Sequence, residues 1–291
     1  MIGRMNDLTV TPSDIRSHDQ DMADLQRAVA LLEAPTLTAK MANLIGSPLE
    51  FVVRKLPSAV SSRIQSVTEA ALYKAAQTAL WSMDSKQPGK SASPRLHKLA
   101  AAASGALGGA GGLPALAIEL PLSTTIIMRA VADIARSEGF DLNDFATRQA
   151  CLEVFALGGN SGKDDASETG YYLARGFTTE VMRHLSAELA GGVATGGPGV
   201  LLGLGPKEAG QWLAKIVEKV AMRFGVVVSE KFAAQAVPVI GAVAGATLNT
   251  IFIGYYQDMA RGHFIVKRLE RKYGFEPVRL AYQSLAGHMR G

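Results

Sequence analysis

The residues best suited to chemistry lie between 164 and 175, where acids, phenols and a guanidinium recur at helical spacing. Asp165, Glu168, Tyr172 and Arg175 are three, four and three residues apart, so a helix would present them on one face. That face could bind a cation through its carboxylates or an anion through Arg175 and Tyr172. We favour a structural role, because acids suit the first turn of a helix and Arg175 can pair with a neighbouring acid. The candidate cluster comprises Asp164, Asp165, Glu168, Tyr171, Tyr172 and Arg175.

A second polar group lies nearer the C-terminus, where a histidine stands beside acids and cations. His263 with Asp258 could do acid–base work, although such a histidine more often packs or caps. Asn249 lies inside an uncharged run and is expected to form an interhelical hydrogen bond. The second candidate motif comprises Asn249, Asp258, Arg261, His263 and Arg268.

The sequence lacks the residue patterns of a phosphate loop, a serine nucleophile or a metal site. The stretch 157–164 contains Gly162 and Lys163 but has Leu157 and Asp164 where a phosphate loop needs glycine and a hydroxyl residue. A serine nucleophile at Ser161 would need a histidine and an acid that the sequence cannot place beside it. The single cysteine and the scattered histidines lack metal-ligand spacing. We therefore predict no metal and no cofactor, and a non-enzymatic protein is expected over an enzyme.

The elements that must position these residues are predicted to be helices. Leu25, Val29 and Leu32 recur at spacings of four and three, and no segment alternates with period two between hairpin turns. The predicted fold class is all-α, a multi-helix bundle with Gly/Ala-rich, closely packed central helices. The predicted helices are 13–34, 37–45, 58–83, 130–157, 164–189 and 207–231, then a basic helix at 258–273 followed by a tail.

The domain organisation follows from one polar stretch. Residues 84–95 are rich in Ser, Pro, Gly and charge, which is typical of a linker. We predict an N-terminal helical segment at 1–83 and a main helical body at 96–291, with the alternative that both form one domain.

Three uncharged runs, at 99–118, 189–206 and 232–257, suggest close helix packing. Each holds small residues four apart, which lie on one helix face and let a second backbone approach. Such runs form either the buried hairpins of a soluble domain or segments that touch a bilayer. Glu119, beside the first run, would need a partner or a raised pKa if buried. The glycine pairs are Gly105–Gly109, Gly108–Gly112, Gly192–Gly196, Gly199–Gly203 and Gly241–Gly245.

The charge of the chain is concentrated near its C-terminus. The whole chain has a formal net charge of +4 and a pI of about 9.1, which is no signature of nucleic-acid binding by itself. Segment 261–279 holds six cations and two acids, so it also carries +4. Anionic lipid headgroups attract such a segment. A solvated helix face with a positive bias explains it as well.

Three stretches resemble one protein family. Residues 238–274, PVIGAVAGATLNTIFIGYYQDMARGHFIVKRLERKYG, are similar to the C-terminal signature of the EcsC protein family. Residues 152–176 and 38–50 resemble its middle and N-terminal motifs. The family takes its name from a bacterial gene beside an ABC-transporter operon, and it has no established biochemical activity. The resemblance therefore implies a bacterial, cytoplasmic or membrane-associated protein and supplies no catalytic residues.

These observations lead to one expected function with two alternatives. We expect a membrane-associated accessory or regulatory protein, cytoplasmic or peripheral at the inner membrane, whose partner is an anionic membrane surface or a membrane protein. One alternative is a peptidase-like hydrolase with a polar site around 158–175. The other is a soluble scaffold that binds a protein or lipid in a hydrophobic cleft. The N-terminus, 1–14, is polar and shows no signal-peptide core.

Overall fold

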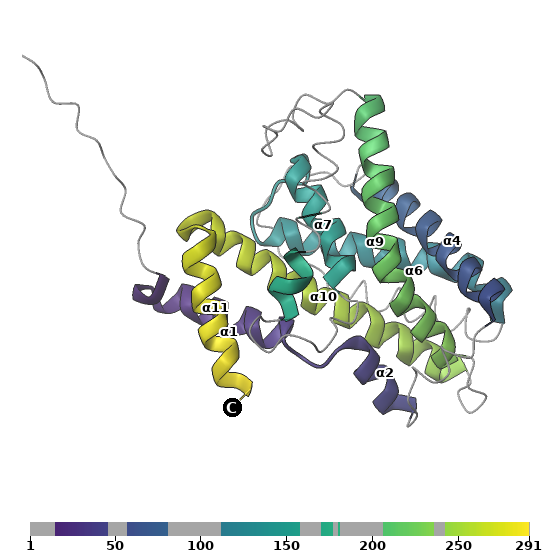
Figure 1. Cartoon of the computed structure of the whole chain (residues 1–291), viewed down its shortest axis with the longest axis horizontal. Coiled ribbons are helices and arrows are strands. Elements are labelled where there is room, and N and C mark those ends of the chain that lie inside the picture. The colour runs from purple at the N-terminus through teal and green to yellow at the C-terminus, as the bar shows by residue number, and fades with distance from the viewer. Residues whose placement is uncertain are drawn as a thin grey trace, which may run out of the picture.

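The described part of the chain is a bundle of helices (Figure 1). The computed structural model describes residues 15–45, 57–80, 112–157, 170–176, 180, 206–235 and 242–290. Within these ranges every regular element is helical, which confirms the predicted all-α fold. The elements are η1 Ile15–Ser17, α1 Asp19–Leu32, α2 Leu37–Ile45, α4 Ser58–Ala75, η2 Ala76–Leu80, α6 Gly112–Ser137, α7 Phe145–Leu157, α9 Pro206–Gln235, α10 Ala242–Tyr273 and α11 Phe275–Arg290. Residues 170–176 form a further short helical segment.

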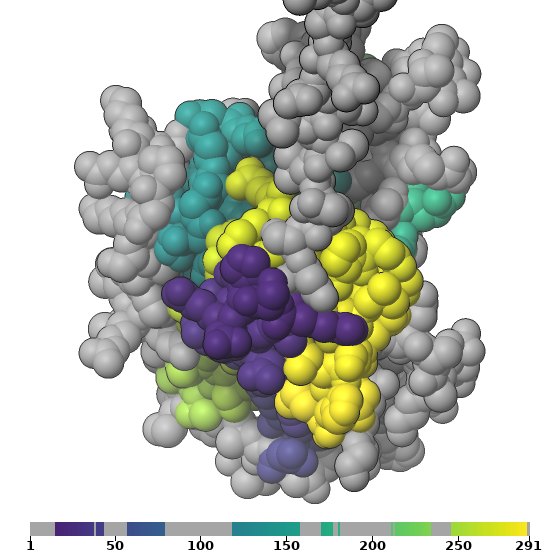
Figure 2. All heavy atoms as spheres, turned by 90° about the vertical axis from the view of Figure 1, so that its left-hand side faces the viewer, coloured from purple at the N-terminus to yellow at the C-terminus, as the bar shows by residue number. Residues whose placement is uncertain are grey.

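Helix α10 runs through the middle of the bundle and contacts most of the other helices (Figure 1). The described structure places α1, α6, α7 and α11 against it. α1 and α11 lie beside each other on one face of the molecule (Figure 2). α4 packs between α6 and α9. Helices before the predicted linker thus contact helices after it. Residues 84–95 lie outside the described part, and the division into two units stays a prediction.

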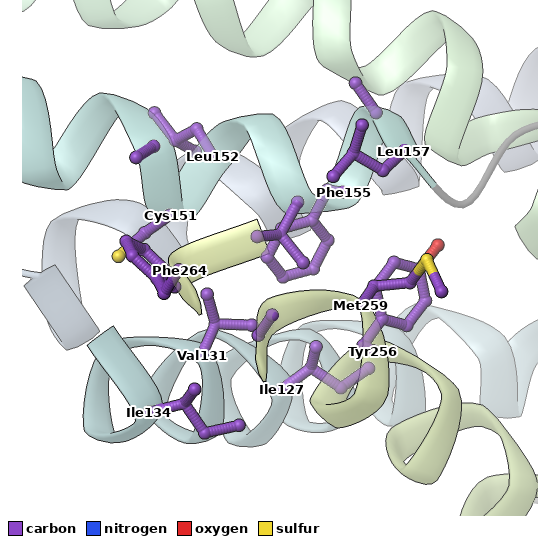
Figure 3. Close-up of a cluster of buried hydrophobic side chains, with 14 of the residues drawn as sticks. Ile127, Val131, Ile134, Cys151, Leu152, Phe155, Leu157, Tyr256, Met259 and Phe264 are labelled. Carbon is purple, nitrogen blue, oxygen red and sulfur yellow. The ribbon is translucent and has the colours of Figure 1, made fainter. Parts of the chain in front are cut away.

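The core joins apolar side chains of α1, α2, α4, α6, α7, α9, α10 and α11. Figure 3 shows the part where α6, α7 and α10 meet. Phe155 of α7 stacks on Tyr256 of α10 with ring centroids 5.3 Å apart, and Phe224 of α9 meets Phe155 edge-on at 5.0 Å. Offset and edge-to-face pairs of this kind add to the stabilisation from apolar burial. The long-range aromatic contacts fix α7 and α10 side by side, which positions the polar side chains described below.

One predicted helix is two, and one predicted tail is a helix; a glycine in the left-handed region lies at each of these places. The predicted helix 130–157 is divided into α6 and α7, because Gly139 adopts a φ of +83°. The Gly139 and Phe140 amides donate to the carbonyls of Arg136 and Ala135, which closes α6 in a Schellman motif. The predicted tail after 273 is instead α11, and Gly274 with a φ of +88° makes the turn before it. Only glycine reaches this conformation without steric cost.

None of the five predicted glycine pairs lies wholly within the described residues. Of their members, Gly112 and Gly245 are described, in α6 and α10. Close approach occurs at another glycine instead. A Cβ added to Gly262 of α10 would lie 2.6 Å from Cγ of Leu32, so this glycine lets α1 sit directly on α10. No helix of the described part combines the length and the apolar content needed to cross a bilayer.

Candidate functional site

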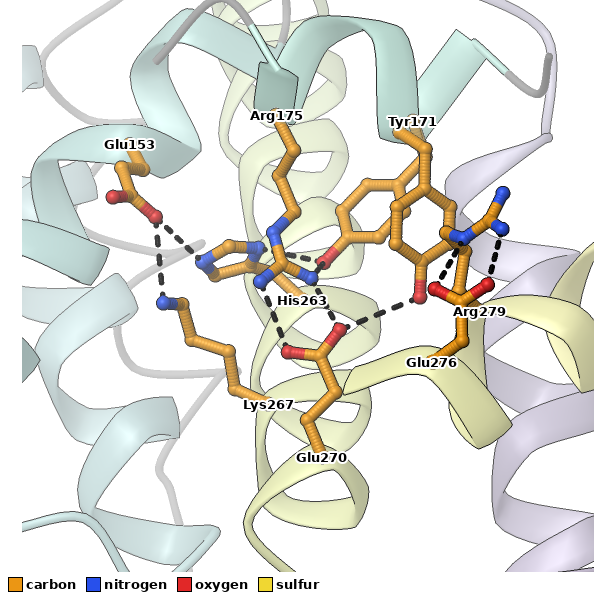
Figure 4. A network of polar contacts seen from close by, with 9 residues as sticks. Glu153, Tyr171, Arg175, His263, Lys267, Glu270, Glu276 and Arg279 are labelled. Atoms are coloured by element: carbon orange, nitrogen blue, oxygen red, sulfur yellow. Dashed lines mark hydrogen bonds and ion pairs between the residues drawn. The ribbon is translucent and has the colours of Figure 1, made fainter. Parts of the chain in front are cut away.

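A buried polar chain joins α7, α10 and the segment 170–176 (Figure 4). The Tyr171 hydroxyl lies 3.0 Å from Nδ1 of His263, and Nε2 of the same ring lies 3.5 Å from Oε2 of Glu153. A carboxylate beside Nε2 favours the tautomer that is protonated there, so Tyr171 donates to Nδ1. Lys267 Nζ shares the same Glu153 oxygen at 3.5 Å, and the Gln149 amide donates to the other oxygen at 2.9 Å.

A second ion pair extends this chain toward α11. The Arg175 guanidinium donates two parallel hydrogen bonds to the Glu270 carboxylate, with N–O distances of 2.6 and 2.9 Å. Its Nη1 also lies 3.4 Å from the Tyr171 hydroxyl, and the Tyr172 hydroxyl donates to Glu270 at 3.4 Å. Paired N–H donors in a fixed plane hold a carboxylate more strongly than a single contact. We refer to Glu153, Tyr171, Tyr172, Arg175, His263, Lys267 and Glu270 as the His263 network.

Helical spacing explains how the chain assembles this network. His263, Lys267 and Glu270 lie four and three residues apart, so one face of α10 supplies three of its members. Tyr171 and Arg175 are four apart on the segment opposite. The rest of the network is built by tertiary contacts.

Burial sets the protonation states of the network. The His263 side chain is 0% exposed, and this burial lowers the pKa of the imidazole to about 4, against the opposing effect of Glu153. Burial alone would raise the pKa of Glu153, but the Lys267 charge and the His263 hydrogen bond outweigh it and hold that pKa below its usual value. Burial also raises the pKa of the Tyr171 hydroxyl. At neutral pH the network therefore holds a neutral imidazole and an ionised carboxylate.

The network is sealed by a helix from the C-terminal end of the chain. Tyr282 of α11 stacks on Tyr171 with ring centroids 5.4 Å apart, and its hydroxyl donates to Glu33 at 2.9 Å, at the end of α1. Both ring nitrogens of His263 face protein groups in a closed interior. Acid–base catalysis needs a base within reach of a substrate proton, and this imidazole offers no solvent-facing atom. The network is best suited to holding four segments of the chain together.

An open pocket lies at the edge of the network, where α7 begins and α11 follows α10. Its volume is about 280 Å³. Lys267 and Glu270 belong both to the network and to the pocket wall. The full lining is Phe140, Asp144, Ala146, Thr147, Ala150, Lys267, Glu270, Arg271 and Phe275. Unlike the buried imidazole, this wall is reached from solvent.

The structure brings the two sequence-derived candidate groups together only in part. Tyr171, Tyr172 and Arg175 meet His263 in the network, whereas Asp164, Asp165 and Glu168 lie outside the described residues. Asn249, Asp258, Arg261 and Arg268 also lie on α10, where Arg268 pairs with Asp24. The Asn249 side chain is buried in the interior of the bundle.

Three members of the network were missed by the sequence analysis, namely Glu153, Lys267 and Glu270. Two carried a usable signal, because Lys267 and Glu270 follow His263 at helical spacing. Glu153 is the one acid in the apolar stretch CLEVFAL, which indicates a buried charge with a distant partner.

Glu119 is likewise a lone acid in an apolar stretch. It forms a 2.6 Å ion pair with Lys231 of α9, both side chains being buried, so the expected partner exists. Burial lowers the pKa of Lys231, and Glu119 opposes that effect.

Much of the C-terminal positive charge is paired with acids from the N-terminal part of the chain. Arg268 lies 2.7 Å from Asp24 and 3.1 Å from Glu138. Lys272 Nζ lies 2.6 Å from Asp21, whose pKa is lowered by hydrogen bonds from Lys272 and Tyr273. These contacts, which we call the α1 clamp, use cations of 261–279 that the sequence left available to lipid.

Metal binding and thiol chemistry find little support in the described part of the chain. There, no group of three or more His, Cys, Asp or Glu side chains is placed to hold a metal ion. Cys151 is a free, buried cysteine, and burial raises the pKa of its thiol. A thiol that stays protonated is a poor nucleophile.

The fold and the network thus define an all-α protein organised around a central helix with a buried ionic interior. The model of the EcsC protein family matches residues 22–269, which is most of the chain. The chain therefore belongs to the EcsC protein family. Neither the curated proteins nor the solved structures contain a match to it.

Proposed function

We propose that this chain is a non-enzymatic, peripheral membrane protein that performs an accessory or regulatory role at an anionic membrane surface. The observation that carries the proposal is the outward face of α9. Met222 and Val226, one turn apart, are 45% and 49% exposed. Large apolar side chains left in solvent at helical spacing are typical of a helix that lies in a lipid interface.

Positive charge lies along the same helix. Lys215 and Lys219 are one turn apart, one position away from the exposed row, with Glu218 as the acid 3.6 Å from Lys219. Arg223 continues the spacing but is half buried. Cationic side chains beside an apolar row match a surface of anionic headgroups, each contributing about 1 kcal/mol near the surface. Ile118 and Leu122 form a second exposed pair, one turn apart on α6.

The geometry favours this role over catalysis. The groups most able to move protons, His263 and Glu153, are buried and engaged with each other. The α1 clamp pairs Arg268 and Lys272, so α9 is a better candidate for the lipid-facing surface than the basic end of α10. We place the protein at the cytoplasmic face of the inner membrane, where it would serve or regulate a transport system.

Flotation of the full chain with lipid vesicles tests the proposal. We expect the protein to float with vesicles containing phosphatidylglycerol and to stay behind with vesicles of phosphatidylcholine alone. High salt should release part of it and alkaline carbonate all of it. The double variant M222S/V226S should lose most of the bound fraction, because it removes the apolar part of the interaction.

The matched control is L280S, which removes an exposed apolar side chain from α11 instead of α9. It should float like the unchanged protein. Equal flotation of M222S/V226S and the unchanged protein would contradict the proposal, as would equal binding to both vesicle types. Resistance to both salt and carbonate would show insertion instead of peripheral docking.

A further inference from the structure

The pocket between α7, α10 and α11 contains a positive group, the Arg271 guanidinium, for which the described residues provide no acceptor. The Arg271 guanidinium lies over the Phe140 ring, 4.1 Å from its centroid. The side chain is exposed, and within the described part of the chain it forms no hydrogen bond or ion pair. Stacking on the ring fixes the orientation of the guanidinium while leaving its five N–H donors available.

A negative group lines the same pocket and is also unengaged. Asp144 immediately precedes α7, and its exposed carboxylate accepts no hydrogen bond and forms no ion pair with the residues that the structure describes. Asp144 and Arg271 do not pair with each other. Glu270, the other acid of the wall, is already held by both guanidinium nitrogens of Arg175. The pocket wall therefore presents the Arg271 guanidinium and the Asp144 carboxylate, which the described residues leave unpaired.

The remaining wall adds a second cation and an apolar surface. Lys267 reaches the pocket, and its contact with Glu153 is a long one at 3.5 Å. The Phe275 ring is 51% exposed. Ala146 and Ala150 complete the apolar part. At about 280 Å³ the space lies at the lower end of small-molecule sites.

We propose that this pocket binds a small zwitterion, a molecule that carries a compact anionic group and an ammonium group a few bonds apart. The anionic group lies against Arg271 and Lys267, where charge-assisted N–H donors converge. The ammonium lies against Asp144. A simple anion would meet the uncompensated Asp144 carboxylate, so the combination of charges selects for both signs on one ligand.

Two sources supply this chemistry, a free amino acid and a zwitterionic lipid headgroup. The inference is independent of the proposed membrane-surface role, since that role uses α9. In Figure 1, α9 lies on the opposite side of the molecule from α11.

Titration calorimetry on the full chain tests the pocket with phosphoethanolamine and L-leucine as probes. Ethanolamine and inorganic phosphate serve as the two separate halves of the first probe. We expect saturable binding of at least one zwitterion at millimolar concentration, with each half about tenfold weaker or more. R271M and D144N should each weaken the zwitterion about tenfold, the loss expected for one charge-assisted contact. R261M, which removes a cation of α10 outside the pocket wall, is the control and should bind like the unchanged protein.

The outcomes separate the possibilities. Vesicles of phosphatidylethanolamine that recruit the protein only when Arg271 is present would identify a lipid source, and binding of L-leucine alone would identify an amino acid. The proposal is overturned if neither zwitterion binds, if one half binds as tightly as the whole, or if D144N strengthens binding. Failure of the membrane role would show separately, because M222S/V226S leaves the pocket unchanged and R271M leaves the α9 surface unchanged.

Discussion

Two faces of α10 use the same residue types under opposite conditions. The His263 network pairs acids and bases in the interior, whereas the α1 clamp pairs Arg268 and Lys272 with acids of α1 at the rim of the molecule. In the network the pairing compensates for desolvation, so the loss of one partner leaves a charge in an environment that cannot solvate it. In the clamp the cations Arg268 and Lys272 are 35% and 53% exposed, so water solvates them if an acid is lost. Burial, and not the number of ion pairs, decides which of these contacts the fold depends on.

The largest difference is expected when one cation is removed from each region. R175M removes two charge-assisted hydrogen bonds to Glu270, whose side chain is only 11% exposed, and we expect the free energy of unfolding to fall by about 3–5 kcal/mol. K272M should have a smaller effect, because the Lys272 side chain is 53% exposed and Asp21 keeps the hydrogen bond from the Tyr273 hydroxyl. Urea unfolding followed by circular dichroism measures both.

The double variant R175M/E270M controls for the unpaired charge. It should recover part of the stability that R175M loses, since an apolar pair needs no ionic partner. A fall for K272M as large as that for R175M would remove the distinction between the two regions.

The His263 network and the α1 clamp should also differ in how their contribution to stability depends on pH. Between pH 6.5 and about 4 the unfolded chain protonates His263 and the folded chain does not. The unfolded state then binds more protons, so the free energy of unfolding falls as the pH drops, by up to about 3 kcal/mol. Asp21 in the clamp has a lowered pKa, so its contribution is lost only as the pH falls below its ordinary value of 3.8.

Urea unfolding of H263Q across this pH range checks the assignment. The slope between pH 6.5 and 4 should flatten relative to the unchanged protein, whatever the stability of H263Q at neutral pH. H288Q, which alters an exposed histidine on α11, should keep the original slope. An unchanged slope in H263Q would assign the acid sensitivity to other groups.

A smaller effect is expected where α1 meets α10 through apolar contact. G262A places a methyl group 2.6 Å from the branched carbon of Leu32, and overpacking of this kind costs about 1–3 kcal/mol. G287A is the matched control, because nothing lies within 4 Å of the added carbon and alanine is the better helix former. Thermal melting should show a lower midpoint for G262A and a slightly higher one for G287A. A neutral G262A would mean that α1 moves away from α10 without cost.

The smallest effect is the response to salt. Screening weakens exposed ion pairs and leaves buried ones almost unchanged. Raising the ionic strength should therefore lower the melting temperature slightly, and this decrease should disappear in the variant R268M/K272M. A decrease that persists in this variant would place the salt-sensitive charges outside the α1 clamp.

The local sequence pattern predicted the helices better than it predicted the residues of the candidate site. The helix predicted at 37–45 is α2 with the same bounds, and the lone acid Glu119 has the partner that its surroundings required. The break at Gly139 was missed because only the backbone shows its positive φ. The helix end at 273 was predicted correctly, but the helix that follows Gly274 was taken for a tail.

The network itself depends on contacts between residues about a hundred positions apart, such as Tyr171 with His263 and Arg175 with Glu270. Helical spacing indicates which residues share a face, but it does not say which face lies opposite. The pairing of two faces is decided by packing in the tertiary structure. This is why Glu153, on the third segment, was not assigned to the network.

The match to the EcsC family ends at residue 269, before the last helix begins. Tyr282, which stacks on Tyr171, therefore belongs to a part of the chain beyond the shared region. Substitutions in this terminal helix can admit water to the histidine while every polar residue of the interior stays the same. The solvent exposure of this buried network is thus controlled by a helix that lies outside the residues matched by the family model.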